Sequence, residues 1–216
     1  MIRPSASPRV LIGLALSSIL AGCASAPAAP ALEVFAPLEC AQSPELAGAI
    51  SLVPEKEKKV WVVDHAINAA SPCLEWEGAK GPYAIFALPS GTPSGPIEIG
   101  AALEAQRVFS PHVVMLDAAG APVRSFTPEQ YHVRSDTYSV QFLPQGKERY
   151  MLVTANPARI GTAYEGIRTG TSNTYIYTGY AAMSWTSGTE TSLSSRFSYD
   201  GVIRAKVFRS EAEGKD

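Results

Sequence analysis

The residues best suited to binding chemistry lie in one segment, 169–197, which is rich in Thr, Ser, Gly and aromatic residues and carries only Glu190 and Arg196 as charges. Aromatic rings stack on the C–H faces of sugars, and neighbouring hydroxyl or amide groups satisfy the sugar hydroxyls. The candidate carbohydrate-binding residues are Asn173, Tyr175, Tyr177, Tyr180 and Trp185. The same composition also suits a half-buried strand. A third interpretation is a hairpin at a sheet edge that pairs with a partner protein.

Motifs of the common catalytic classes are absent from the sequence, which contains no GxSxG elbow, HExxH, P-loop or dinucleotide-binding glycine pattern. His65, His112 and His132 each stand alone in their segments. Asp64 precedes His65, but adjacent residues of a strand point to opposite faces, which disfavours a catalytic pair.

Three carboxylates, Asp117, Asp136 and Asp200, are conceivable members of a pair for glycoside hydrolysis. Two of them are better explained as turn residues, since "DAAG" (117–120) favours a type I turn and "DG" (200–201) favours a hairpin turn before the last strand. We therefore expect no enzyme, no cofactor and no metal site.

The N-terminus has the pattern of a cleavable signal. Residues 1–9 contain two arginines and no acid, and the apolar run 10–20 has 11 residues. At roughly 1.5 Å per residue this run covers about half of a bilayer core of ~30 Å, which predicts a signal peptide (1–22) and no spanning helix. "LAGC" (20–23) resembles the lipobox of bacterial lipoproteins and predicts lipid attachment at Cys23. The alternative is an ordinary signal with a chance cysteine.

The charge balance argues against a polyanionic partner. Cleavage after residue 22 removes Arg3 and Arg9, which leaves 16 basic residues against 20 acidic ones and a net charge of about −4. A mildly acidic domain gains nothing from the field of a nucleic acid, so we expect none as a partner.

Ala24, which follows the lipobox cysteine in place of aspartate, favours the periplasmic face of the outer membrane, by resemblance to enterobacterial sorting.

Cys40 and Cys73 are the two cysteines that remain if Cys23 is lipidated. Thiols in an oxidising compartment pair, so one disulfide is expected, worth roughly 4 kcal/mol in the chain-entropy model. Two buried free thiols are the alternative. A metal site would need further ligands, and His65 has no partner at a ligand spacing.

The remaining chain reads as a tether followed by one all-β domain. Residues 23–37 are the lipidated cysteine and a tether rich in Pro and Ala, and residues 38–216 form the folded domain. Strand patterns occur at 59–63, 83–88, 96–103, 112–116, 122–126, 137–142, 149–153, 174–180 and 202–208. They predict an antiparallel β-sandwich of about nine short strands. One or two short helices are expected to begin near Ser43 and Asn156.

The stretch "VFSPHVVMLDAAGAPVRSF" (108–126) resembles the maltose operon periplasmic protein family. Weaker similarity runs through "YAIFALP" (83–89), "LPQGKERYMLVTAN" (143–156), "IGTAY" (160–164) and "YDGVIRAKV" (199–207), covering roughly 82–208. These matches are strands and turns, so the resemblance implies a shared fold and offers no catalytic residues. The family is periplasmic and associated with maltose and maltodextrin uptake.

The sequence thus predicts a non-catalytic lipoprotein that is held on a membrane by its lipid anchor. By the resemblance, its expected role is accessory to uptake of maltodextrin-type oligosaccharides through sugar binding. The alternative is an interaction lipoprotein that docks an envelope protein through the Thr- and Tyr-rich hairpin.

Overall fold

The computed structural model describes residues 30–37, 39–54, 59–89, 95–177 and 182–209. Within these ranges the chain forms fourteen strands and three 3-10 helices: η1 (Leu46–Gly48), η2 (Pro128–Gln130) and η3 (Pro157–Arg159). No helix in the described ranges is long and apolar enough to cross a membrane. The predicted signal peptide and Cys23 lie outside the described residues.

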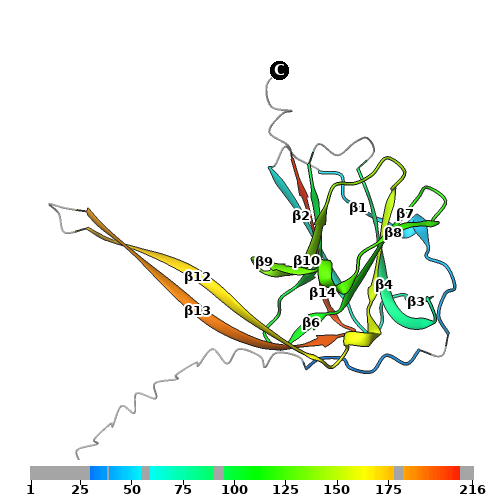
Figure 1. The fold of residues 1–216 in the computed structure, drawn as a ribbon, viewed down its shortest axis with the longest axis horizontal. Coiled ribbons are helices and arrows are strands. Elements are labelled where there is room, and N and C mark those ends of the chain that lie inside the picture. The colour runs from blue at the N-terminus through cyan, green and yellow to red at the C-terminus, as the bar shows by residue number, and fades with distance from the viewer. Residues whose placement is uncertain (1–29, 38, 55–58, 90–94, 178–181, 210–216) are drawn as a thin grey trace, which may run out of the picture.

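Two sheets face each other and a third extends from them (Figure 1). The six-stranded sheet consists of β1 (Ile50–Ser51), β3 (Cys73–Trp76), β4 (Ala79–Ala87), β7 (Pro111–Leu116), β8 (Pro122–Ser125) and β11 (Tyr150–Ala155). The five-stranded sheet consists of β2 (Val60–Ile67), β5 (Ile97–Ala102), β9 (His132–Arg134), β10 (Thr137–Phe142) and β14 (Gly201–Phe208). The third sheet contains β6 (Arg107–Phe109), β12 (Ala163–Tyr177) and β13 (Ala182–Ser198). Named strand pairs are antiparallel except β1–β4 and β6–β13.

The main core lies between the first two sheets, and the central strands supply most of it: all six residues of β5 are buried. Phe86 and Met115 of the six-stranded sheet and Ile99, Val140 and Ile203 of the five-stranded sheet belong to this cluster. A smaller cluster on the other face of the six-stranded sheet contains Leu74, Ile85, Val114 and Leu152. This packing is that of a β-sandwich, as the sequence predicted.

Each of the nine predicted segments coincides at least in part with an observed strand, and five strands have no predicted segment of their own. Four of these, β1, β3, β6 and β9, are only two to four residues long, too short for a pattern of alternation to show. The fifth, β13, was expected only as the second strand of the hairpin in 169–197, because its 17 residues are mostly small and hydroxylated and give no apolar period.

The turn at Asp117 is confirmed. The backbone N–H groups of Ala119 and Ala121 donate to its carboxylate at 2.8 and 2.9 Å, and β7 and β8 pair on either side. The predicted hairpin at Asp200–Gly201 is wrong, because β14 pairs with β2 and β5 whereas β13 pairs with β12 and β6. The chain changes sheets at this turn, and Gly201 has a φ of 144° there.

A short helix is present at each of the two expected places, and one of the two expected capping residues is confirmed. The Asn156 side chain accepts a hydrogen bond from the Ala158 N–H at 3.1 Å and begins η3. The helix expected near Ser43 is η1, which begins at Leu46, but its N-cap is Glu45 in place of Ser43, and the Glu45 side chain makes no capping hydrogen bond.

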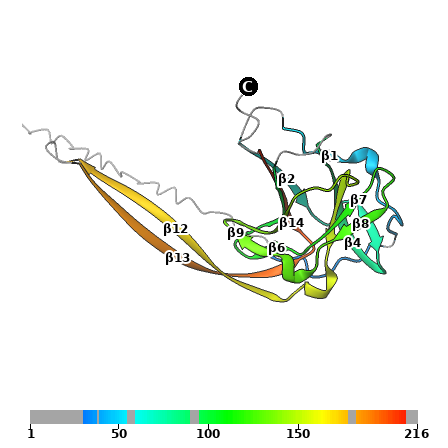
Figure 2. The same ribbon diagram turned by 45° about the horizontal axis from the view of Figure 1, so that its top comes forward.

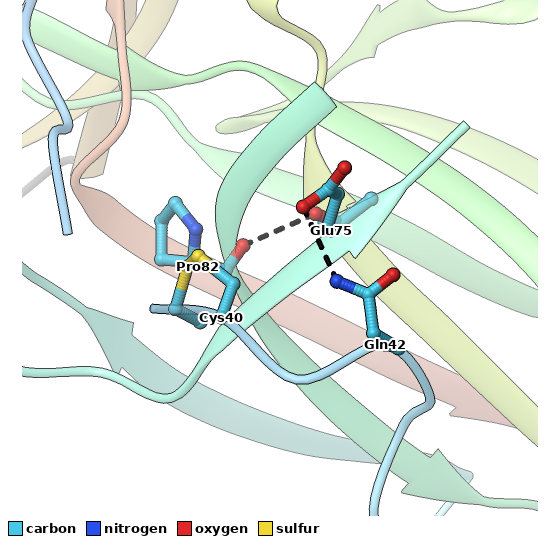
Figure 3. Close-up of a disulfide and its surroundings, with 6 residues drawn as sticks. Cys40, Gln42, Glu75 and Pro82 are labelled. Atoms are coloured by element: carbon cyan, nitrogen blue, oxygen red, sulfur yellow. Dashed lines mark hydrogen bonds between the residues drawn. A yellow bond between two sulfur atoms is a disulfide. The ribbon is translucent and has the colours of Figure 1, made fainter. Parts of the chain in front are cut away.

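Cys40 and Cys73 form the expected disulfide, with Cα atoms 4.8 Å apart (Figure 3). The bond joins the N-terminal segment to β3. Beside it, the Glu75 N–H donates to the carbonyl of Ala41 at 2.9 Å, and the Gln42 amide donates to the Glu75 carboxylate at 3.2 Å. Covalent and hydrogen bonds thus fix the N-terminal segment along the six-stranded sheet.

Candidate functional site

The most conspicuous feature is the hairpin of β12 and β13, which points away from the sandwich in both views (Figures 1 and 2). The two strands pair from Ala163 opposite Arg196 to Tyr177 opposite Ala182. At ~3.3 Å per residue, the 15 residues of β12 span about 50 Å. The described strands leave both edges of the hairpin unpaired beyond its base, where β6 joins β13 at Arg196–Ser198.

The predicted carbohydrate-binding residues lie towards the end of this hairpin, and the structure describes four of them by strand pairing. Asn173, Tyr175 and Tyr177 occupy alternate positions of β12. Trp185 pairs with Thr174. Directly opposed residues share a face of a strand pair, so the Trp185 position is out of phase with the three β12 positions. Tyr180 lies outside the described residues.

The base of the hairpin is held by an aromatic cluster. The Phe197 ring lies 5.4 Å from that of Tyr138 and 5.7 Å from that of Tyr164, measured between centroids. The Arg159 guanidinium lies over Phe197, 4.1 Å from its centroid. Cation–π and edge-to-face contacts of this kind add to the burial of Phe197, which is fully enclosed.

The N-terminal segment is bound at the same base, through an arrangement we call the N-terminal clip: Leu32 and Phe35 against Ser198, Tyr199 and Asp200. The Leu32 N–H donates to the Ser198 hydroxyl at 2.7 Å and to the Asp200 carboxylate at 3.0 Å, and the Tyr199 N–H donates to the Leu32 carbonyl at 2.9 Å. The Phe35 ring stacks on Tyr199 with centroids 5.5 Å apart.

Asp200 is the central acceptor of the clip. Its carboxylate is buried and also accepts hydrogen bonds from the Ser198 hydroxyl and from the Arg107 guanidinium. Arg107 in turn contacts Glu104 at 3.1 Å. The sequence explained Asp200 as a turn residue, and the structure gives it a second task, binding a segment 168 residues away.

A concave site lies elsewhere, where the turn between β3 and β4 meets the ends of β8 and β11. This cleft has a volume of about 380 Å³, within the usual range for small-molecule sites. Trp76 is the last residue of β3, Glu77 lies in the turn, His112 comes from β7, and Asn156 comes from the start of η3. The other lining residues are Ala79, Pro111, Ser125, Phe126, Thr127, Pro128, Tyr131, Thr154, Ala155 and Pro157.

The cleft combines aromatic surface with polar groups that can exchange hydrogen bonds. The Trp76 indole N–H is buried and has no hydrogen-bond partner in the described structure. Burial lowers the pKa of His112, against a smaller opposing effect of the Glu77 carboxylate, so the imidazole is neutral at pH 7 and can both donate and accept. Asn156 uses its carbonyl oxygen on the Ala158 N–H, which leaves its amide NH₂ as a donor.

The polar residues considered for catalysis have other partners. Asp64 binds the Arg204 guanidinium through both oxygens, at 2.7 and 2.6 Å, and Arg204 also binds Asp136. His65, by contrast, contacts Phe86 edge-on. Within the described ranges, no three His, Cys, Asp or Glu residues are grouped to hold a metal ion.

Comparisons of this chain with known protein families, with curated proteins and with solved structures found no match. The resemblance to the maltose operon periplasmic protein family therefore stays a prediction.

The cleft residues were not predicted to form one site, because Trp76, His112 and Asn156 are separated by dozens of residues and share no motif. Strand pairing brings them together, since β11 lies between β4 and β7.

Proposed function

We propose that this protein is a non-catalytic, lipid-anchored protein of the bacterial envelope that binds carbohydrate and assists the uptake of maltodextrin-type oligosaccharides. Its carbohydrate site is the cleft between Trp76, His112 and Asn156. The observation that carries this proposal is the combination, in one concave site, of an indole, a neutral imidazole and amide and hydroxyl groups.

These groups match the two needs of a neutral sugar. The indole of Trp76 offers an apolar face for the C–H surface of a pyranose ring. His112, Asn156 and the hydroxyls of Ser125 and Thr127 can donate to and accept from sugar hydroxyls. The volume of about 380 Å³ is enough for a short oligosaccharide segment, and the open shape lets a longer chain extend beyond it.

The cleft is a better carbohydrate site than the hairpin positions for a geometric reason. A sugar ring is bound tightly when a concave surface covers both its face and its rim. In the register of β12 and β13, the Trp185 position is out of phase with those of Asn173, Tyr175 and Tyr177. The described strands also place no second surface beside the outer part of the hairpin that could enclose a sugar. The non-catalytic character is supported by the engagement of Asp64 with Arg204, which deprives His65 of an orienting carboxylate.

Calorimetric titration with maltose, maltodextrins and unrelated oligosaccharides tests this function. We expect saturable binding of maltodextrins. Trp76→Leu and Asn156→Ala should each weaken it about ten-fold or more, since each removes a stacking face or a hydrogen bond worth ~1.5 kcal/mol. Trp185→Leu, the matched control on the hairpin, should leave affinity unchanged.

Each alternative outcome has a definite meaning. Loss of binding in Trp185→Leu but not in Trp76→Leu would return the site to the hairpin. Absence of binding by any sugar tested would refute the carbohydrate function altogether.

The unpaired edges of the hairpin favour a second candidate function, docking of an envelope protein. Long free strand edges are templates for another strand, and peptide recognition by strand addition uses them. A photoreactive residue at Thr171 or Thr189, which lie along the two strands, should then trap one specific protein in intact cells. Removing 170–189, which leaves the Thr169–Glu190 pair to close the turn, should abolish that product.

A further inference from the structure

The N-terminal clip fixes how far the predicted lipid anchor can lie from the hairpin. Leu32 is bound to Ser198 and Asp200 at the base of the hairpin, and Cys23 precedes Leu32 by nine residues. A fully extended chain spans at most ~3.5 Å per residue, so the anchor lies within about 30 Å of this base. The surface of the membrane that holds the anchor is therefore equally close.

The hairpin is longer than this distance. Between Tyr164, which packs in the aromatic cluster at the base, and Tyr177 at its far end, β12 rises about 43 Å at ~3.3 Å per residue. The far end is consequently within reach of the membrane surface whenever the hairpin points to the side of the molecule on which the anchor lies. The clip lies at the base of the hairpin, because β13 runs directly into Ser198, so the segment that leads to the anchor and the hairpin both start from this point.

The residue types at the far end suit a membrane interface. The last paired positions are Tyr175–Ser184, Ile176–Met183 and Tyr177–Ala182, preceded by Thr174–Trp185. No charged residue occurs between 169 and 189. Tyr and Trp concentrate at the headgroup level of membranes, where one side of the ring is apolar and the other is hydrated.

A free hairpin gains from such a contact. Two-stranded hairpins are marginally stable in water on their own, and the described strands place no third strand or helix against the outer part of this one. The headgroup region supplies apolar surroundings to the aromatic positions and still offers water to unpaired backbone groups at the strand edges.

We infer that the far end of the β12–β13 hairpin binds the interfacial region of the same membrane that holds the lipid anchor, giving the protein a second membrane contact. This inference rests on the proposed lipidation of Cys23 for its geometry. The contact is apolar, so it requires no anionic lipid and is insensitive to salt.

Vesicle flotation tests the contact without the lipid anchor. The mature chain with Cys23→Ser, which retains every described residue, is mixed with vesicles of phosphatidylethanolamine alone or with phosphatidylglycerol. We expect flotation with both, at low and high salt. Replacing Tyr177 and Trp185 with serine should reduce the partition coefficient at least about ten-fold, through lost aromatic burial. Replacing Thr171 and Thr189 with serine, the control closer to the base, should leave it within about two-fold.

A second measurement follows the hairpin directly. With Trp61 and Trp76 changed to phenylalanine, Trp185 is the single tryptophan. Its emission should shift to shorter wavelength on adding vesicles and be quenched by brominated lipid. Circular dichroism melting of each variant shows whether the sandwich remains folded.

The outcomes separate this inference from the proposed function. Absence of both flotation and a Trp185 shift, or unchanged flotation of the Tyr177 and Trp185 variant, overturns the membrane contact while leaving sugar titrations unaffected. Flotation confined to vesicles that contain outer-membrane proteins assigns the hairpin to a protein partner and also overturns it. Absence of sugar binding together with normal flotation refutes the carbohydrate function and leaves the membrane contact standing.

Discussion

Replacing Asp200 with alanine should detach the N-terminal segment and destabilise the sandwich. The change removes a carboxylate that accepts from the Leu32 N–H at 3.0 Å, a contact to a charged group worth ~1.5–3 kcal/mol. It also removes one partner of Arg107. Breaking a buried ion pair costs ~3–5 kcal/mol, but Arg107 keeps Glu104 at 3.1 Å and is partly exposed, which reduces this cost. We therefore expect the free energy of unfolding to fall by about 3 kcal/mol in all.

Urea unfolding followed by circular dichroism measures this loss. Asp117→Ala is the matched control, because Asp117 is also a turn carboxylate with backbone N–H partners, lies partly exposed and has no ion pair with another described residue. It should cost only about 1 kcal/mol. In addition, a protease should cleave 30–37 faster in Asp200→Ala than in the control. Equal losses in the two variants, or unchanged cleavage, would refute the reading of Asp200 as the centre of the clip.

Three further outcomes follow from the described contacts. Reducing the Cys40–Cys73 disulfide should lower the free energy of unfolding by roughly 4 kcal/mol in urea titrations, because it frees a loop of 33 residues in the unfolded chain. Burial holds the pKa of the folded-state His112 below 6.5, so the unfolded chain binds this proton at a higher pH than the folded chain does. The stability of the fold therefore falls as the pH drops through 6.5. His112→Gln should flatten this decline in melting curves recorded from pH 8 to 5. Gly100→Ala would place a Cβ 2.0 Å from the Tyr138 carbonyl oxygen, and should lower the melting temperature strongly or prevent folding.

The fold was predictable where a strand carries its own signal. Tyr138, Val140 and Phe142 alternate in sequence, and all three are buried on one face of β10. Asp117 and Asn156 mark local hydrogen bonds to nearby backbone N–H groups, which depend on a few residues only. Short-range patterns and the short-range structure they specify therefore agree.

Strand partners could not be predicted in the same way. The Asp200–Gly201 pair specifies a turn, but whether the flanking strands pair is decided by which sheet buries each of them. Ile203 and Ala205 are fully buried against the six-stranded sheet, which draws β14 beside β5 and away from β13. The Asp200–Gly201 pair therefore predicted the position of the turn correctly, but it predicted the pairing of the flanking strands wrongly.

The cleft was hidden for a related reason. Trp76 comes from β3, His112 from β7 and Asn156 from the position just before η3, and none is unusual in its own segment. His112 reads as one residue of an apolar strand, and Trp76 as one aromatic before a Glu-Gly turn. Their meeting depends on the β4–β11–β7 order of the sheet, a long-range property that one sequence does not reveal.

The cleft, the hairpin and the N-terminal clip share structural supports. This sharing determines which substitutions can test each of them separately. The helix η3 is capped by Asn156 in the cleft and ends at Arg159, which lies over Phe197 at the base of the hairpin. Phe197 immediately precedes Ser198 of the clip. A change at Arg159 would consequently disturb cleft, hairpin base and clip together, and its effect on sugar binding or on membrane binding would identify none of them. Trp76 belongs to β3 and Trp185 to β13, and neither is part of η3 or of the clip, so opposite effects of their replacement on the two binding reactions would show that the cleft and the hairpin are separate sites.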